Sequence, residues 1–307
     1  MKKFYSHGKL LLTGEYLVLD GSISLAVPSV FGQSLNVETS KNNTLQWISL
    51  NETNTIWFET EFDLQHRKLL KRNQDNSAIS ERLLQILKAA QHLNPEFLTD
   101  TKGYKITTSL EFPKNWGLGT SSTLINNIAS WANVNPYQLL EASFGGSGYD
   151  IACAKANGSL TYQVLKNNKK SIKEITFNPP FKAHLYFVYL NQKQNSRDGI
   201  AQYRANTSDL SLIISRITDL TTEMIKCDSL SAFQSLMNEH EQLISGIIKQ
   251  TPVKARLFND FKGSIKSLGA WGGDFVMVAS KDNPTPYFKT KGYEIILSYS
   301  EMVLNTK

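Results

Sequence analysis

A glycine-rich turn stands between an expected strand and an expected helix, and it restricts the fold more than any other stretch. The strand, residues 103–112, alternates in polarity and runs into Pro113. The turn and the helical pattern after it read NWGLGTSSTLINN over residues 115–127. A plain turn with a Ser or Thr helix cap explains this stretch. A phosphate-binding loop also explains it, because glycines let the backbone approach an anion and free helix N–H groups point at it.

The composition is that of an ordinary globular protein. The 307 residues are 41% hydrophobic and 20% charged, and no run of about 18 apolar residues occurs. Gly14 and Glu15 interrupt the short apolar run near the N-terminus, which also lacks a small-residue cleavage site, so we expect no export signal. Two cysteines, Cys153 and Cys227, fit a reducing cytoplasm. We therefore expect a cytoplasmic protein without a membrane partner.

The chain is moderately basic, with a formal net charge of +6 and a pI of about 9.1. This charge fits an anionic substrate, and it would equally fit weak nucleic-acid binding. The basic residues are scattered, except in KNNKK at residues 166–170, which we interpret as a solvated hairpin loop. Aromatic and basic residues are not interleaved as in RNA-binding modules, so we expect no nucleic-acid partner.

Strand and helix patterns occur in mixed order along the chain. The first sixty residues favour strands, and a helical stripe follows Ser77, a suitable cap. The later chain predicts helices over 208–227, 229–249 and 253–268, then a closing strand pair. This order indicates an α+β protein of two lobes. We place the boundary near residue 170, with one domain over 1–170 and a second over 171–307.

Three glycine-bearing segments follow one another across nearly the whole chain. They read GKLLLTGEYLVLDG at 8–21, GLGTSST at 117–123 and LGAWGGDFVMV at 268–278. None is a Walker A loop or a dinucleotide fingerprint. In this order they resemble the three motifs of the GHMP kinases, the family of galactokinase, homoserine kinase, mevalonate kinase and phosphomevalonate kinase. Two details, GSGYDIACAKANGS at 146–159 and GAWGGD at 269–274, resemble the phosphomevalonate kinase-like branch.

The resemblance implies a fold and two cofactors. It implies a two-lobed α+β protein with an N-terminal mixed α/β lobe and a C-terminal ferredoxin-like lobe, which uses ATP and Mg²⁺. The ATP phosphates would lie on the loop formed by Gly117, Leu118, Gly119, Thr120, Ser121 and Ser122. By the same resemblance the Ser121 hydroxyl would lie near Mg²⁺, whereas the residues alone allow Ser121 to be a simple helix cap.

Two residues are the candidates for catalysis. Asp150 stands after a glycine-rich turn and is the expected general base, although an acid there also suits a turn or a helix cap. If the acceptor is itself a phosphate, Asp150 would mainly orient it. Lys9 would pair with Asp150 or stabilise charge on the transferred phosphoryl group, the alternative being a solvated surface lysine.

The expected substrate contacts come from several segments. Lys193, Ser196 and Arg197 suit an anionic substrate, since arginine binds phosphate with two parallel hydrogen bonds; a solvated loop is the alternative. The other expected substrate contacts lie in three glycine-containing stretches of the chain and are Glu15, Ser147, Gly148, Gly272 and Gly273. Asp274 contacts a ligand or ends a turn.

The chain departs from the family at two places. Trp271 stands where the family usually has glycine, so a ring that narrows the pocket or stacks on a ligand is expected. The interval from Ser121 to Asp150 is only 29 residues, shorter than is usual in the family. In relatives this interval supplies a Glu for Mg²⁺, and Glu141 is the candidate here. The shortening would also suit a wider acceptor pocket or a homodimer contact.

The residues and the resemblance together favour an ATP- and Mg²⁺-dependent kinase of small molecules, with phosphomevalonate or mevalonate as the expected acceptor. A kinase for a sugar or an amino-acid alcohol is one alternative. A catalytically weak protein that keeps the fold and binds ATP is another, with the short interval and Trp271 in its favour. Retention of Lys9, Ser121 and Asp150 speaks against that second alternative.

Overall fold

The chain forms two compact units, each assembled from separate stretches of sequence. The computed structural model describes residues 1–65, 68–71, 77–99, 102–192, 196–205 and 208–304. Unit 1 comprises Met1–Gly8, Phe31–Lys114 and Gly119–Lys155. Unit 2 comprises Lys9–Val30, Asn115–Leu118 and Ala156–Lys307. Each predicted domain, 1–170 and 171–307, is one continuous stretch of sequence. The compact units are instead built from interleaved stretches, and the predicted domain boundary stays a prediction.

The sheet of unit 1 has the strand order β5-β4-β3-β6-β2. Neighbouring strands are antiparallel, except for β3 and β6, which pair in parallel. Side chains along β3 alternate between buried and more exposed positions, as expected of a sheet covered on one face. The strands are β1 (Lys2–Leu11), which pairs with β2, β2 (Ser24–Ser40), β3 (Thr44–Leu50), β4 (Ile56–Gln65), β5 (Lys68–Lys71) and β6 (Gly103–Leu110).

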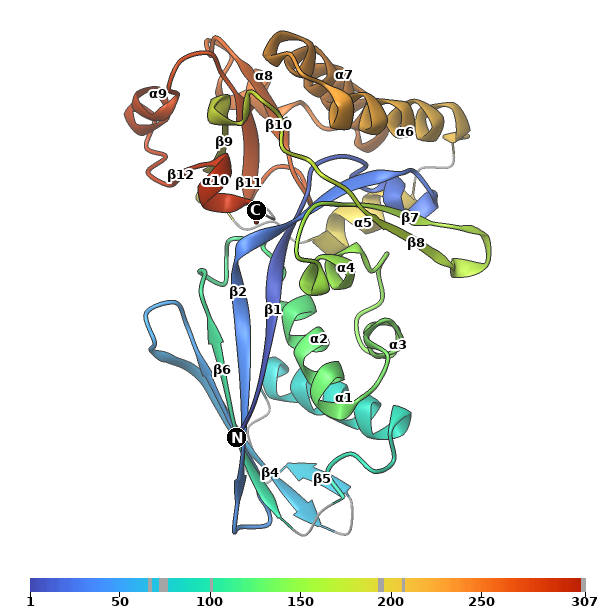
Figure 1. Cartoon of the computed structure of the whole chain (residues 1–307), viewed down its shortest axis with the longest axis vertical. Helices are drawn as coiled ribbons and strands as arrows, with labels where there is room; N and C mark the ends of the chain where they lie inside the picture. The colour runs from blue at the N-terminus through green and yellow to red at the C-terminus, as the bar shows by residue number, and fades with distance from the viewer. Residues whose placement is uncertain (66–67, 72–76, 100–101, 193–195, 206–207, 305–307) are drawn as a thin grey trace. The chain divides into compact units, whose positions relative to one another are not determined.

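Helices cover one face of this sheet (Figure 1). They are α1 (Ala78–Leu93), α2 (Thr120–Ala132), α3 (Pro136–Glu141) and α4 (Tyr149–Lys155). The core joins strand residues such as Trp47 and Phe62 to the apolar stripes of the helices, for example Leu87 and Ile125. Ser77 caps α1 by accepting a hydrogen bond from the Ser80 N–H group, which confirms the predicted start of that helix.

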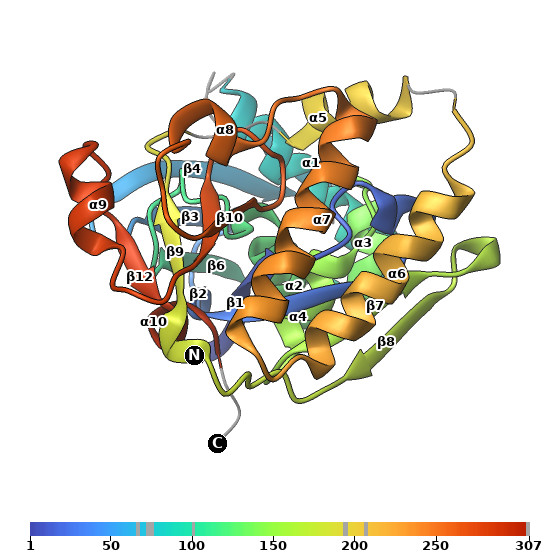
Figure 2. The same ribbon diagram turned by 90° about the horizontal axis from the view of Figure 1, so that it is seen from above.

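The second sheet, in unit 2, has the order β10-β11-β9-β12, and all neighbouring strands are antiparallel. Helices α5 to α8, of which α6 and α7 lie side by side in Figure 2, connect β9 to β10, and α9 connects β11 to β12. This is the ferredoxin-like arrangement, which confirms the predicted α+β class. The elements are β9 (Leu185–Tyr189), α5 (Ser196–Arg204), α6 (Ser211–Lys226), α7 (Leu230–Ile248), α8 (Val253–Leu257), β10 (Ser264–Ser267), β11 (Phe275–Ala279), α9 (Thr285–Thr290), β12 (Ile296–Ser298) and α10 (Tyr299–Met302).

Unit 2 also holds the first part of β2, which pairs with β7 (Leu160–Val164), and β7 continues into β8 (Lys170–Glu174). The lysine-rich stretch 166–170 is exposed at the turn of this hairpin, as predicted. The predicted helix over 253–268 is wrong. Helix α8 is short, and the chain then enters β10 through Gly263, where a Cβ atom would lie 2.7 Å from the Ala279 carbonyl oxygen. That close backbone approach suits a strand that pairs with β11.

Candidate phosphate-binding site

Helix α2 begins directly at the glycine loop, residues 117–122. Its N-cap is Gly119, whose φ of 92° is left-handed, and no side chain caps the first turn. The neighbouring hydroxyls donate to carbonyls instead: Ser122 Oγ lies 2.8 Å from the Gly119 oxygen, and Thr123 Oγ1 lies 2.7 Å from Gln33 Oε1. Ser121 is exposed and is not the N-cap. A plain Ser or Thr cap therefore does not explain the loop, and the N-terminal end of α2 suits an anion.

The three glycine-bearing segments meet in pairs within unit 2. The Lys9 N–H group, in the first segment, donates to the Leu118 carbonyl of the second at 2.9 Å. The Tyr16 hydroxyl, also in the first segment, donates to the Ala270 carbonyl of the third at 2.9 Å. A Cβ atom added at Gly117 would overlap the Asp274 carboxylate, so the second and third segments are also in contact. Segments far apart in sequence thus share one region of this unit.

Glu15, an expected substrate contact, lies in a fully buried charged cluster of unit 2. Its carboxylate accepts a hydrogen bond from the Lys266 ammonium, and Glu15 Oε2 lies 3.4 Å from His240 Nε2. The same nitrogen of His240 accepts from the Gly14 N–H group at 2.9 Å. Burial raises the pKa of Glu15, and the nearby Lys266 opposes that rise. These contacts describe a side chain that positions the first segment, while contact with a substrate stays a prediction.

A second acid, Glu241 of α7, completes the cluster. It accepts from Ser267, whose N–H group and hydroxyl lie 3.0 and 2.8 Å from its two carboxylate oxygens. Burial raises the pKa of Glu241 to about 7, although Lys266 and Ser267 oppose the rise. Burial also lowers the pKa of His240 well below its usual value, with a further lowering from Lys266. His240 is therefore neutral, as its role as acceptor for the Gly14 N–H group requires.

The cluster residues Lys266, His240 and Glu241 were not predicted from the sequence. Lys266 stands among serines and single apolar residues in SIKSL, just before the third glycine segment, and nothing there distinguishes it from a solvated lysine. Nothing in the sequence paired it with Glu15, which is 251 residues away.

Unit 1 holds the candidates on and beside helices α3 and α4. Asp150 is half-buried in the first turn of α4, which packs against α2, the helix that begins at the glycine loop. Ser147 and Gly148 precede it, and Gly148 is left-handed with a φ of 89°. Glu141 is exposed at the last residue of α3, which also packs against α2. Unit 1 therefore brings Asp150 and Glu141 onto helices that contact α2.

The other predicted residues belong to unit 2. Lys193 lies outside the described residues, and Ser196 and Arg197 open α5, where only their backbone is described. Gly272 and Gly273 lie in the turn between β10 and β11. The Trp271 ring is 1% exposed and packs in an apolar cluster with residues of α5, α6 and α7, so it fills core space, and a narrowing of the pocket by this ring stays a prediction. The cluster includes Tyr16, Tyr203, Ile217, Leu220, Ile244, Ile247 and Ile248.

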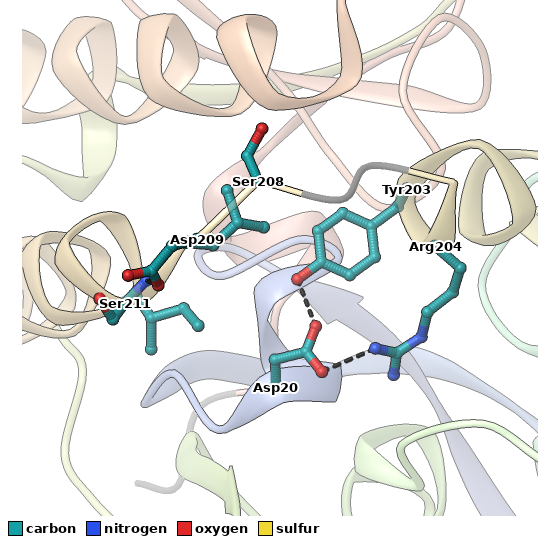
Figure 3. Close-up of a pocket in the computed structure, with 8 residues that line it drawn as sticks. Asp20, Tyr203, Arg204, Ser208, Asp209 and Ser211 are labelled. Carbon is teal, nitrogen blue, oxygen red and sulfur yellow. Dashed lines mark hydrogen bonds and ion pairs between the residues drawn. The ribbon is translucent and has the colours of Figure 1, made fainter.

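A surface cavity of 320 Å³ lies in unit 2 where α5 ends and α6 begins (Figure 3). Asp20 accepts from the Tyr203 hydroxyl and from Arg204 there, the latter at 2.7 Å. None of the predicted site residues is among the described residues that line it, which also include Ser208, Asp209, Leu210, Ser211 and Ile214. The cavity is therefore a feature separate from the glycine loop.

Neither a metal cluster nor a membrane helix is found among the described residues. No three His, Cys, Asp or Glu side chains there lie together as metal ligands. Within the same ranges, no helix has the length and apolar character needed to cross a bilayer. Mg²⁺ at phosphoryl-transfer sites is commonly held by one or two carboxylates together with substrate phosphates, and the Mg²⁺ role of Ser121 and Glu141 stays a prediction.

The fold is that of the GHMP kinases. No family model and no curated protein matches the chain by sequence. Among solved structures, the chain is similar to Methanococcus jannaschii mevalonate kinase, with 20% identity, a TM-score of 0.71 and 96% of each chain covered. It is also similar to Streptococcus pneumoniae phosphomevalonate kinase in complex with phosphomevalonate and AMPPNP, with 16% identity, a TM-score of 0.68 and 95% of each chain covered. Lactococcus lactis galactokinase complexed with galactose has 13% identity and a TM-score of 0.66, covering 99% of this chain and 94% of its own. The predicted GHMP kinase fold is confirmed.

Proposed function

We propose that the chain is an ATP-dependent kinase of small molecules. The observation that carries this proposal is the start of α2, where Gly119 is left-handed and no side chain caps the first turn. The N–H groups of such a turn, together with the helix dipole, are suited to bind the phosphates of a nucleotide. The GHMP kinase fold and the meeting of the glycine segments in unit 2 support the same function.

The roles of the side chains follow from their chemistry. The backbone of Gly117–Ser122 binds phosphate, Asp150 orients the attacking oxygen or accepts its proton, and Lys9 stabilises charge on the transferred group. Mg²⁺ would be held by Ser121 and Glu141. When bound, it would neutralise charge on the phosphate oxygens. Positioning and charge neutralisation are what phosphoryl transfer requires of a protein.

The proposed acceptor is phosphomevalonate or mevalonate, which places the enzyme in isoprenoid synthesis. The net charge of +6 suits an anionic acceptor, and kinases for both compounds are among the similar structures. We propose Glu15, Ser147, Gly148, Lys193, Ser196, Arg197, Gly272 and Gly273 as acceptor contacts. A cytoplasmic location and a homodimer remain predictions from the sequence.

The test is ADP release with Mg·ATP and a panel of acceptors: mevalonate, 5-phosphomevalonate, homoserine, galactose and no acceptor. The expected result is turnover on mevalonate or 5-phosphomevalonate that falls by at least about a hundredfold in Asp150→Asn. The matched control is Asp282→Asn, the same change at an exposed acid, which should keep wild-type turnover. Failure to bind ATP at all would overturn the kinase proposal.

A further inference from the structure

The first two residues of the glycine loop belong to a short stretch of unit 2. Asn115–Leu118 belongs to unit 2, and Gly119, the N-cap of α2, begins a stretch of unit 1. We call Asn115–Leu118 the anchor segment. Each of its four residues has its own contact within unit 2, and those contacts come from parts of the chain that the sequence separates widely.

Aromatic side chains hold the first half of the anchor segment. The Trp116 ring meets the Phe275 ring edge-on, with centroids 5.3 Å apart, and lies 6.4 Å from the Tyr189 ring. Tyr189 also contacts Phe275, at 5.3 Å, so the three rings form one cluster at the ends of β9 and β11. The Tyr189 hydroxyl donates to the Asn115 carbonyl at 3.1 Å. Edge-on aromatic pairs of this kind stabilise a fixed arrangement.

Asp274 holds the next residue, Gly117. The Asp274 side chain occupies the place where a Cβ atom of residue 117 would lie, and Gly117 has a left-handed φ of 69°. Asp274 is itself fixed to the end of β9: its N–H group donates to the Gln192 carbonyl at 2.6 Å, and its carbonyl accepts from the Leu190 N–H group at 2.8 Å. Gly117 is therefore required by a close approach as well as by its φ.

The last residue of the anchor segment is tied to the first glycine segment. Leu118 is fully buried, and its carbonyl accepts from the Lys9 N–H group at 2.9 Å. Four consecutive residues are thus held in place by contacts of the protein itself. A loop held in its binding shape loses less entropy when it binds, so the nucleotide is bound more tightly.

We propose that Trp116 and Asp274 are positioning residues for the nucleotide, a role that rests on the proposed kinase function. They touch no reacting atom in this proposal; they act through the backbone of Gly117 and Leu118. Loss of either one would loosen the loop and raise the KM for ATP, while the KM for the acceptor would change little. A rise in the KM for ATP without a rise in the KM for the acceptor distinguishes positioning of the loop from a general loss of folded protein.

The test uses the full chain and a double-mutant cycle. The variants are Gly117→Ala, Asp274→Gly and their combination, with Asp274→Asn as the variant that keeps the shape of the side chain. Gly292→Ala is the matched control, because Gly292 also has a left-handed φ, of 84°, but a Cβ atom there would meet nothing within 4 Å. Trp116→Ala and Trp116→Phe form a second pair. Thermal unfolding and the KM values for ATP and acceptor are measured for each.

We expect Gly117→Ala to raise the KM for ATP by about tenfold or more, since small displacements of a binding loop have effects of this size. Adding Asp274→Gly should restore part of this loss, because the clash is removed. Asp274→Asn and Trp116→Phe should stay near wild type, whereas Asp274→Gly and Trp116→Ala should raise the KM for ATP alone. Gly292→Ala should leave both KM values unchanged.

The outcomes separate this proposal from the kinase proposal. Additive effects of Gly117→Ala and Asp274→Gly on thermal unfolding would overturn the anchoring of the loop, whether or not the wild type is a kinase. Equal changes of both KM values in the single variants would overturn the positioning role. Coupling in thermal unfolding without ATP binding by the wild type would uphold the anchored loop and overturn the kinase function on which its role in binding depends.

Discussion

The two units bury their polar side chains in different kinds of hydrogen-bond network. In unit 1 a neutral network joins β1, β2 and α2: Asn127 accepts from the Ser6 hydroxyl at 2.7 Å and donates to the Gln33 carbonyl at 2.8 Å. In unit 2 a charged network joins the first glycine segment to α7 and β10 through Glu15, Lys266 and Glu241. All of these side chains are buried.

The two networks differ in the free energy that their burial costs and in their dependence on pH. Neutral amides and hydroxyls lose little on burial once their hydrogen bonds are made, and they do not titrate near neutrality. Buried charges are expensive unless each one keeps its partner, and burial shifts their pKa values. The first glycine segment therefore depends on protonation, whereas the helix that begins at the glycine loop does not.

The largest expected effect is the loss of one charge in unit 2. Lys266→Met leaves Glu15 buried without its cation, so we expect the free energy of unfolding to fall by about 3–5 kcal/mol. Urea unfolding followed by circular dichroism measures it. Adding Glu15→Gln should recover part of the loss, because both charges are then absent. Lys262→Met, at an exposed position, is the control, and a loss for Lys266→Met no larger than the control's would contradict the charged network.

The second effect is a dependence of the free energy of unfolding on pH, which arises from a buried acid of unit 2. The folded-state pKa of Glu241 is about 7, above the ordinary value of 4.5, so the folded protein keeps a proton that the unfolded chain releases. Stability from this group is complete below pH 4.5 and is lost as the pH rises to about 7, by up to about 3 kcal/mol.

Urea unfolding of Glu241→Gln between pH 4.5 and 8 checks this sign. The variant should lose less stability than the wild type as the pH rises. Glu52→Gln, at an exposed position, should keep the wild-type slope. If the free energy of unfolding of Glu241→Gln depends on pH as steeply as that of the wild type, then Glu241 is not the group that holds the proton.

A smaller effect is expected in the neutral network of unit 1. Asn127→Leu leaves the Ser6 hydroxyl and the Gln33 carbonyl without their buried partner, and we expect a loss of about 1–3 kcal/mol. The loss should be the same at pH 5 and pH 7.5, because none of these groups titrates. Unfolding at both pH values measures it, and a strong pH dependence would erase the contrast between the two units.

The smallest effect comes from a second buried neutral pair in the same unit. The Thr108 hydroxyl donates to Ser49 Oγ at 3.0 Å, and Ser49 also accepts from the Trp47 ring nitrogen at 3.1 Å. Thr108→Val removes one of these bonds and leaves the other, so we expect a loss of about 1 kcal/mol. Thermal unfolding detects a change of this size, and a loss as large as that of Lys266→Met would show that neutral bonds are as costly to break as charged ones.

Local patterns predicted the fold where an element was long and covered on one face. The apolar stripe and Ser77 predicted α1, and the turn-rich sequence around residues 166–170 predicted the β7–β8 hairpin. Strand β10 was missed because it has only four residues and three of them, Ser264, Lys266 and Ser267, are polar, so nothing in its sequence indicates a buried strand. Helix α4 was missed because it has only seven residues and follows a glycine-rich turn.

The candidate site was predicted in its parts but not in its assembly. The order of the glycine segments pointed to the GHMP kinase fold. The contacts between them, such as Asp274 with Gly117, come from long-range packing that no local pattern contains. Trp271 shows most clearly what a local pattern does not predict. A tryptophan in place of the family's glycine suggested a ligand contact, yet the ring fills an apolar cluster of unit 2.

The kinase function depends on the binding of nucleotide phosphates by the backbone of residues 117–122. Hydrogen–deuterium exchange of the full chain, with and without Mg²⁺ and AMPPNP, tests it most directly, because the method reports which amides are protected. We expect saturable binding and slower exchange of the amides in 117–122. No binding at millimolar AMPPNP, or binding that protects other segments and leaves 117–122 unchanged, would contradict it.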